Sequence, residues 1–268
     1  MSARSGVGAP AADSSSDGEG RPALSVVIPT LDEARSIGAT LDVLLHEGEG
    51  VEVIVVDGGS SDATREIARV RGAKLIESGR GRGLQMREGA RAARGRALWF
   101  LHADTLPPRD FAARIEEALR DPSVVAGNFD VLFDGGGRPA RFLTWLYPRL
   151  RALGLCYGDS GIFARRDAYE RVGGFRAFPI FEDLDLVRRL RRVGRVAHLR
   201  ARVTTSSRRF EGRSFALTFA RWSLLQGLYW LGVSPDTLAR LYAPVRGAGA
   251  RRKGDGGGTK RGGAPTSG

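Results

Sequence analysis

Short apolar runs alternate with amphipathic segments along the first half of this chain, and no other feature constrains the fold as strongly. The apolar runs have the length of buried strands, at residues 24–28, 51–56, 73–76 and 97–101. The amphipathic segments have helical spacing or helix-capping residues, at 32–46, 60–71, 83–94 and 108–120. This order predicts an α/β fold in which helices cover both faces of a mostly parallel central sheet.

The order becomes less regular after Asp121. We expect further strands at 124–132, 162–164 and 198–205, and helices at 138–153, 181–193 and 214–231. The length of 268 residues and the hydrophobic content of 42% fit a single domain over 22–245. Residues 1–21 and 246–268 are poor in large apolar side chains, so we predict two disordered tails, the C-terminal one basic.

Acidic side chains follow three of the predicted strands at their carboxyl ends. Pro29 ends the first strand and is followed by Asp32 and Glu33, Asp57 ends the second strand, and Asp104 follows the fourth. Each of these acids taken alone is more often a turn or helix-capping residue. Ligands of open parallel sheets, however, bind beyond the carboxyl ends of the strands. Three acidic strand ends at one rim therefore predict a binding site.

The composition of this rim favours an oxygen-ligated metal. Asp104 comes two residues after His102, and Cys156 is the single cysteine, which excludes a disulfide framework and a cysteine-based zinc site. Mg²⁺ and Mn²⁺ typically bind through one or two carboxylates plus substrate phosphates. The net charge of +12 fits an anionic ligand such as a diphosphate. The run Gly79–Gly83, which contains Arg82, resembles a phosphate loop only weakly, and a solvated turn is the alternative.

Targeting signals are not evident in the sequence. The N-terminus lacks the cationic start and apolar run of a signal peptide. The charge-free stretch 222–233 is too short to cross a bilayer. These features predict a cytoplasmic protein.

Four motifs occur in order along the chain: LSVVIPTLDEA, VEVIVVDGGSSDAT, FLHADT and FEDLDL. Their sequences and spacing resemble glycosyltransferase family 2, which has the GT-A fold that binds nucleotide-diphospho-sugars. The resemblance implies a donor half at about 22–121 and an acceptor half at about 122–245. The longer motifs GRGLQM, FLHADTLPP, YGDSGIFARRDAYERVGGF, FEDLDLVRRLRRVGRV and VTTSSRRFEG look like one bacterial subgroup, associated with radical SAM and selenoprotein-type domains. The resemblance covers about residues 24–242.

This resemblance implies an inverting enzyme that moves a sugar from a nucleotide-sugar donor to a hydroxyl acceptor, with Mn²⁺ or Mg²⁺. The acceptor it implies is a lipid, a polyprenoid or a cell-envelope glycan. The implied residues are Pro29, Asp32, Glu33, Asp57, Arg82 and His102 for the donor, Asp104 for the metal, Asp183 with Glu182 for catalysis, and Gly158, Asp159, Ser160 and Gly161 for an acceptor loop.

Two observations bear on these implied roles. Asp183 stands at the start of a predicted helix, where the helix dipole would lower its pKa and weaken it as a base, and where it would serve equally well as a helix cap. The chain departs from the subgroup at two positions. It has Ser160 where the subgroup usually has Gln, and Arg87 where the subgroup often has Asn. The segment 218–222 reads TFARW and lacks the glutamine of the Q-x-x-R-W motif, which argues against a processive synthase.

Three alternatives stay open at this point. A sugar-nucleotide pyrophosphorylase is disfavoured, because its glycine- and lysine-rich loop after the first strand is replaced here by TLDE. A basic nucleic-acid-binding protein is disfavoured, because no recognised binding motif accompanies the arginines and the rim is acidic; we expect no nucleic-acid partner. Peripheral membrane contact is the third. The stripe Phe215, Phe219, Trp222, Leu225, Tyr229 and Trp230 would face the membrane, with core packing of that helix as the competing reading.

Overall fold

The computed structural model describes residues 21–48, 50–152, 155–206 and 214–242. Apart from Arg21, the two predicted tails lie outside the described residues. The helices of the described part are α1 (Ile37–Glu47), α2 (Thr64–Val70), α3 (Arg82–Ala92), α4 (Phe111–Arg120), α5 (Arg138–Ala152), α6 (Arg166–Arg171), α7 (Glu182–Leu190), α8 (Phe215–Trp230) and α9 (Pro235–Tyr242), with a 3₁₀ turn at Gly158–Ser160. The strands are β1 (Leu24–Thr30), β2 (Val51–Asp57), β3 (Lys74–Glu77), β4 (Ala97–Phe100), β5 (Thr105–Leu106), β6 (Val124–Phe133), β7 (Ile162–Arg165) and β8 (Arg195–Thr205).

These strands form one sheet of eight, within the residues described, in the order β3-β2-β1-β4-β7-β6-β8-β5. β1 pairs in parallel with β2 and β4, β2 pairs in parallel with β3, and β6 pairs in parallel with β8. β7 is antiparallel to both β4 and β6, and β5 is antiparallel to β8. The predicted α/β class with a mostly parallel sheet is therefore confirmed, although β5, α6 and α9 had no counterpart in the sequence reading.

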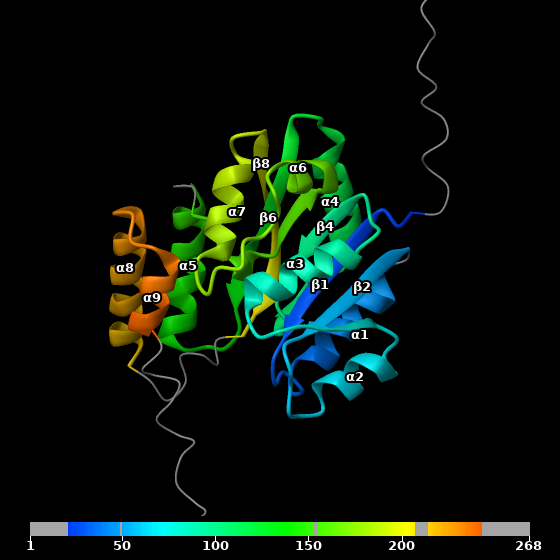
Figure 1. Cartoon of the computed structure of the whole chain (residues 1–268), viewed down its shortest axis with the longest axis horizontal. Coiled ribbons are helices and arrows are strands. Elements are labelled where there is room, and N and C mark those ends of the chain that lie inside the picture. Colours follow the sequence, from blue (N-terminus) through cyan, green and yellow to red (C-terminus); the bar gives the residue numbers. More distant parts are fainter. Residues whose placement is uncertain (1–20, 49, 153–154, 207–213, 243–268) are drawn as a thin grey trace, which may run out of the picture.

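Helices cover both faces of the sheet (Figure 1). Val26 and Ile28 of β1 belong to an apolar cluster with α1, α4 and α5, whereas Val27 belongs to a second cluster with α3, α6 and α7. Burial on both faces explains why the strands read as continuous apolar runs. Trp99 of β4 is fully buried and stacks on Phe111 at 5.1 Å between ring centroids. Truncating such a side chain costs about 3–5 kcal/mol, so the strand that leads to Asp104 is firmly held.

Helices α8 and α9 lie beside α5 at one side of the molecule (Figure 1). Their packing decides between the two readings of the stripe on α8, because most members of the stripe face inward. Leu225 is buried, Phe215 and Phe219 pack edge-on against Phe142 of α5, and Tyr229 stacks on Phe181. Core packing, the competing reading, therefore accounts for these side chains. None of the described helices is both long and apolar enough to cross a bilayer.

Candidate active site

The acidic strand ends lie along one edge of the sheet, as the sequence predicts. β2, β1 and β4 are parallel neighbours, so their carboxyl ends meet at the same rim. Asp57 at the end of β2 is 1% exposed, and its carboxylate accepts hydrogen bonds from the backbone N–H groups of Gly59 and Ser60 and from the hydroxyl of Thr30. Burial alone would raise the pKa of Asp57, but these hydrogen bonds and the one from the Ser60 hydroxyl lower it. Asp57 therefore stays ionised and shapes the loop that follows β2.

The loops after β1 and β2 are joined by reciprocal hydrogen bonds. Asp32 accepts from the Ser61 N–H at 2.7 Å and donates its own N–H to the Ser60 hydroxyl at 2.9 Å. Glu33 donates its N–H to the Thr64 hydroxyl at 2.8 Å. Asp32 has a φ of 56°, a left-handed conformation that is uncommon outside glycine. These contacts hold the two acidic loops in one arrangement. Neither Asp32 nor Asp57 is the N-cap residue of the helix that follows it.

Gln85 of α3 is part of this rim and was not singled out by the sequence. Its buried side-chain amide donates to the carbonyl oxygens of Thr30 and Val56, at 2.8 Å each. The two carbonyls end β1 and β2, so Gln85 clamps the strand ends that present Asp32 and Asp57. The only local signal was its place in GRGLQM, which the motif resemblance already included.

A second group of site residues meets around Gly158. The Gly158 N–H donates to Asp183 at 2.6 Å, and His102 Nδ1 lies 3.0 Å from a carboxylate oxygen of Asp159. A Cβ on Gly158 would approach His102 Nε2 to 2.8 Å and Asp183 to 3.3 Å, so the three residues are in close contact. Tyr147 donates to the other oxygen of Asp159 at 3.0 Å. The predicted acceptor loop, catalytic acid and rim histidine therefore come together from separate parts of the chain.

Arg82 connects this group to α3 through an ion pair with Glu182. Glu182 is 1% exposed and one of its carboxylate oxygens has no partner among the described residues. Burial, followed by repulsion from Glu182, raises the pKa of Asp183 to about 6 even though Arg82 opposes the shift. The expectation of a lowered pKa at the helix terminus was wrong, because burial and the Glu182 charge outweigh the hydrogen bonds from the Gly158 and Leu184 N–H groups, which lower the pKa.

The neighbouring acid Asp185 has a different environment. Its carboxylate accepts from Arg189 at 2.7 Å and 2.9 Å and from Arg176 at 3.3 Å. These ion pairs give Asp185 a structural role. Asp183 also accepts from the Leu184 N–H at 2.7 Å, so it does contact the start of its own helix.

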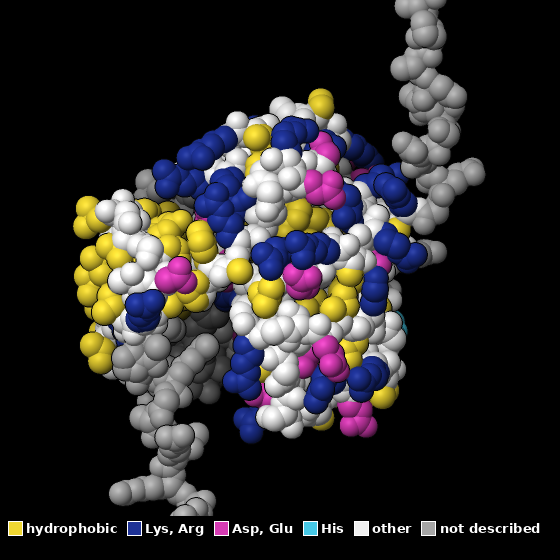
Figure 2. All heavy atoms as spheres, in the orientation of Figure 1, with side chains coloured by type: hydrophobic (Ala, Val, Ile, Leu, Met, Phe, Trp, Pro, Cys, Tyr) yellow, Lys and Arg dark blue, Asp and Glu magenta, His cyan; other side chains and the backbone are white. Residues whose placement is uncertain are grey.

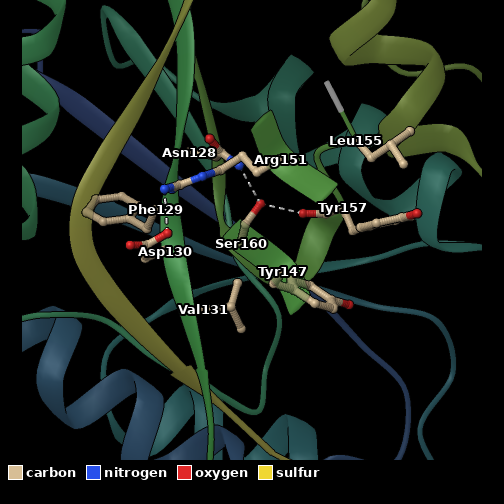
Figure 3. A pocket seen from close by; sticks show the side chains of 9 residues that line it. All are labelled: Asn128, Phe129, Asp130, Val131, Tyr147, Arg151, Leu155, Tyr157 and Ser160. Atoms are coloured by element: carbon tan, nitrogen blue, oxygen red, sulfur yellow. Dashed lines mark hydrogen bonds and ion pairs between the residues drawn. The ribbon is translucent and has the colours of Figure 1, made fainter. Parts of the chain in front are cut away.

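The back of the acceptor loop lines a small cavity (Figure 3). Ser160 accepts a hydrogen bond from the Asn128 amide at 3.0 Å and donates to the Tyr157 carbonyl at 2.5 Å. Arg151 reaches across to Asp130 on the opposite wall in an ion pair. The cavity volume of about 10 Å³ has room for roughly one water molecule. The cavity therefore supports the loop and is too small for a sugar.

The metal-binding prediction rests on Asp104 and its surroundings. Asp104 is half-buried, and no hydrogen bond or ion pair of its carboxylate occurs among the described residues. His102 is 8% exposed, and its Nε2 is buried with no hydrogen-bond partner within the described part of the chain. The described residues contain no group of three or more metal-ligating side chains. A single free carboxylate at the rim fits an ion that is held largely by substrate phosphates.

Gly83 fixes how α3 approaches the loop before α7, and it provides a stability prediction. A Cβ there would come within 2.5 Å of the Arg176 carbonyl oxygen. We expect Gly83→Ala to lower the free energy of unfolding by about 1–3 kcal/mol through overpacking. Gly227→Ala in α8 is the matched control, since nothing lies within 4 Å of its Cβ position and alanine favours a helix by up to about 1 kcal/mol. Urea unfolding of both variants measures the difference; equal stability would contradict this packing.

The fold and the acidic rim together define an α/β domain of the GT-A type. The mannosyltransferase PcManGT from Pyrobaculum calidifontis, solved with GDP-Man and Mn²⁺, superposes with a TM-score of 0.59 and 25% identity, over 78% of this chain and 63% of that one. Glucosyl-3-phosphoglycerate synthase from Mycobacterium tuberculosis, at 22% identity, shares the fold with a TM-score of 0.54, over 75% of this chain and 76% of that one.

The sequence model of Glycosyl transferase family 2 matches residues 25–172, more than half of the chain, and the chain belongs to this family. It is 29% identical over 170 residues to glycosyltransferase AglE of Haloferax volcanii, covering 58% of this chain and 56% of that protein. It is 35% identical over 116 residues to dolichyl-phosphate beta-glucosyltransferase of Drosophila melanogaster, covering 36% and 35%. The chain thus spans about half the length of these curated relatives or less. Membership of this family argues against the two alternatives from the sequence, a sugar-nucleotide pyrophosphorylase and a nucleic-acid-binding protein.

Proposed function

We propose that this family 2 glycosyltransferase inverts configuration as it moves a sugar from a nucleoside-diphosphate sugar to a hydroxyl acceptor, with the help of a divalent metal ion. The observation that carries the proposal is the buried Asp183, whose pKa is raised to about 6 and which accepts a hydrogen bond from the acceptor loop at Gly158. A carboxylate with a raised pKa accepts a proton from a hydroxyl more readily than an ordinary one does.

The proposed step is a single displacement. The acceptor oxygen attacks the anomeric carbon, its proton passes to the carboxylate of Asp183, and the bond from the anomeric carbon to the diphosphate breaks with its electron pair leaving on the diphosphate. Attack from the face opposite the leaving group inverts the anomeric centre. Glu182 serves this step by holding Arg82 and by keeping the pKa of Asp183 raised.

The donor is assigned to the rim at the strand ends. Asp32, Glu33 and Asp57 would contact the base and ribose, beside Pro29 on β1. Arg82 and His102 would lie toward the diphosphate, because both touch the Asp183 group across the rim. The reciprocal bonds between the β1 and β2 loops support this assignment, since a preformed site loses less conformational entropy on binding.

The proposed metal ion is Mn²⁺ or Mg²⁺, held by Asp104 together with the diphosphate. Such an ion, when bound, stabilises the negative charge that develops on the departing diphosphate. The fit rests on the unpartnered carboxylate of Asp104 at the end of β4 and on the buried, unpartnered Nε2 of His102.

The acceptor is assigned to the lipid-linked or cell-envelope class. The relatives that support this are the dolichyl-phosphate beta-glucosyltransferase and a PGL/p-HBAD biosynthesis glycosyltransferase of Mycobacterium tuberculosis, which is 37% identical over 103 residues. We further propose that residues 22–245 act as one catalytic domain in the cytoplasm, at the inner face of the membrane. Membership of the subgroup associated with radical SAM and selenoprotein-type domains rests on the motif resemblance and is part of this proposal.

Slow hydrolysis of the donor tests this function without a known acceptor, because water replaces the acceptor hydroxyl. The protein is incubated with UDP-, GDP-, ADP- and dTDP-sugars and Mn²⁺, and released nucleoside diphosphate is measured. Release from one nucleotide class, with inversion of the sugar detected by NMR, supports the proposal. Release of nucleoside monophosphate instead would contradict it, since that product requires cleavage between the two phosphates.

The raised pKa of Asp183 predicts the pH dependence of this reaction. The base acts in its ionised form, so kcat/KM should be half-maximal near pH 6, level off at higher pH and approach a loss of about tenfold per pH unit at lower pH. Initial rates between pH 4.5 and 8 at constant ionic strength measure the profile. An acidic limb centred near pH 4, the ordinary value for an aspartate, would contradict the assigned environment.

A further inference from the structure

Apolar side chains gather on the outer surface over α8 and α9 (Figure 2). Leu217 and Leu224 of α8 and Leu231 at its C-terminal end are 72%, 63% and 83% exposed. They are seven residues apart, which places them on one face of the helix. Trp230, Leu241 of α9 and Trp145 of α5 are also more than half exposed. We refer to these six side chains as the α8 apolar face.

The surroundings of the α8 apolar face are basic. α8 contains Arg221 and no acidic residue, α5 contains no acidic residue either, and the one acid of α9, Asp236, is balanced by Arg240 on the same helix. Arg138, Arg141 and Arg149 of α5 are exposed, and the Arg149 guanidinium stacks over the Trp145 ring at 3.9 Å. An arginine beside an exposed tryptophan suits the boundary between apolar tails and charged headgroups.

The sequence after α9 adds to the positive charge and offers little to cover the face. It contains Arg246, Arg251, Arg252, Lys253, Lys260 and Arg261 against the single acid Asp255, and Val245 is its only large apolar residue. A second copy of the chain is also disfavoured as the occupant, since two basic faces repel each other. An apolar face with a basic margin matches an anionic lipid surface.

The inner side of α8 is joined to the proposed acceptor site. Tyr229 stacks on Phe181, which directly precedes Glu182 and Asp183, at 4.8 Å between ring centroids. Tyr157, which directly precedes Gly158, donates its hydroxyl to the Gln226 side chain at 3.3 Å. One helix, roughly 10 Å across, therefore separates the acceptor loop from the apolar face.

We propose that the α8 apolar face docks on an anionic lipid bilayer and thereby holds the acceptor loop at the membrane surface, within reach of a lipid-linked hydroxyl. This inference rests on the proposed transferase function, because it assigns the partner of the same acceptor site. Leu217, Leu224, Leu231 and the two tryptophans enter the boundary between headgroups and tails, while the arginines meet lipid phosphates.

Co-sedimentation of the full chain with vesicles tests this docking. The vesicles are phosphatidylcholine alone or phosphatidylcholine with phosphatidylglycerol. We expect binding to the anionic vesicles that weakens with added salt, and a drop of at least about tenfold in the double variant Leu217→Glu/Leu224→Glu. Val70→Glu is the matched control, since Val70 of α2 is 79% exposed outside this face and its substitution should leave binding unchanged.

Three results would overturn the docking proposal: no binding to anionic vesicles, equal binding by the double variant, and a dimer in light scattering that the double variant abolishes. The donor site is checked in the same samples by Mn²⁺-dependent nucleotide binding. A double variant that loses vesicle binding but still binds nucleotide shows an effect on docking alone. If the unaltered protein binds vesicles but neither it nor any variant binds nucleotide, the proposed function is contradicted and the docking proposal is retained.

Discussion

Asp183→Asn is expected to keep donor binding and to lower the transfer or hydrolysis rate by about 10²–10⁴-fold, the usual contribution of a general base. The substitution removes the group that takes the acceptor proton. It keeps one oxygen that can accept the hydrogen bond from the Gly158 N–H. Because the ionised carboxylate is penalised by burial, a neutral amide should not lower the free energy of unfolding by much. Initial rates and nucleotide titration on the same preparation measure the two effects.

The matched control for this variant is Asp167→Asn. Asp167 is also an acid in the first turn of a helix, but its side chain is 67% exposed and pairs with Arg171 in the following turn. We expect its rate to equal that of the unaltered protein. A rate for Asp183→Asn within about threefold of the control would exclude Asp183 as the base and leave it a role at the start of α7.

Asp104→Asn is expected to remove the gain in nucleotide affinity that Mn²⁺ provides, with the fold unchanged. Its carboxylate makes no hydrogen bond or ion pair among the described residues, so the substitution breaks no contact of the folded chain. Loss of a group that only orients a metal ligand typically lowers metal affinity by about 10–100-fold, so loss of a direct ligand should lower it by at least as much. Titration calorimetry with a nucleoside diphosphate, with Mn²⁺ and with EDTA, measures the difference.

Asp110→Asn controls for the loss of an acid near the same strand. Asp110 is exposed and pairs with Arg114 one turn along α4, at 2.7 Å. The nucleotide affinity of the Asp110→Asn variant should depend on Mn²⁺ as it does in the unaltered protein. Full Mn²⁺ dependence in Asp104→Asn would mean that the ion is held elsewhere.

The sequence predicts the sheet and its acidic rim well, because both depend on local patterns. A strand buried on both faces appears as a continuous apolar run, and the acids come directly after those runs, as Asp57 does at the end of β2. The antiparallel insertion of β7 between β4 and β6 leaves no such trace, because strand direction is set by the path of the chain between elements. The two-residue strand β5 and the helix α6 are too short for periodicity to detect.

The candidate catalytic group could be predicted only as separate motifs. Arg82 and Glu182 are 100 residues apart in sequence, and nothing in either motif indicates that they pair. The environment of Asp183 was likewise invisible, since its pKa depends on burial beneath the acceptor loop and on the neighbouring Glu182. The membrane-facing reading of the α8 stripe failed for a related reason: most of its residues, among them Phe219 and Tyr229, lie on the packed side of the helix, and the exposed leucines seven residues apart were not part of it.

The most direct test of the central claim, a metal-dependent nucleotide-sugar site at the strand ends, is thermal unfolding with UDP, GDP, ADP and dTDP, each with Mn²⁺ and with EDTA. A nucleotide at about one hundred times its dissociation constant adds roughly 2.7 kcal/mol to the free energy of unfolding. For a domain of this size that raises Tm by about 5–10 °C. The account predicts such a rise with one nucleotide, only when Mn²⁺ is present. An unchanged Tm with all four nucleotides in Mn²⁺ would contradict it.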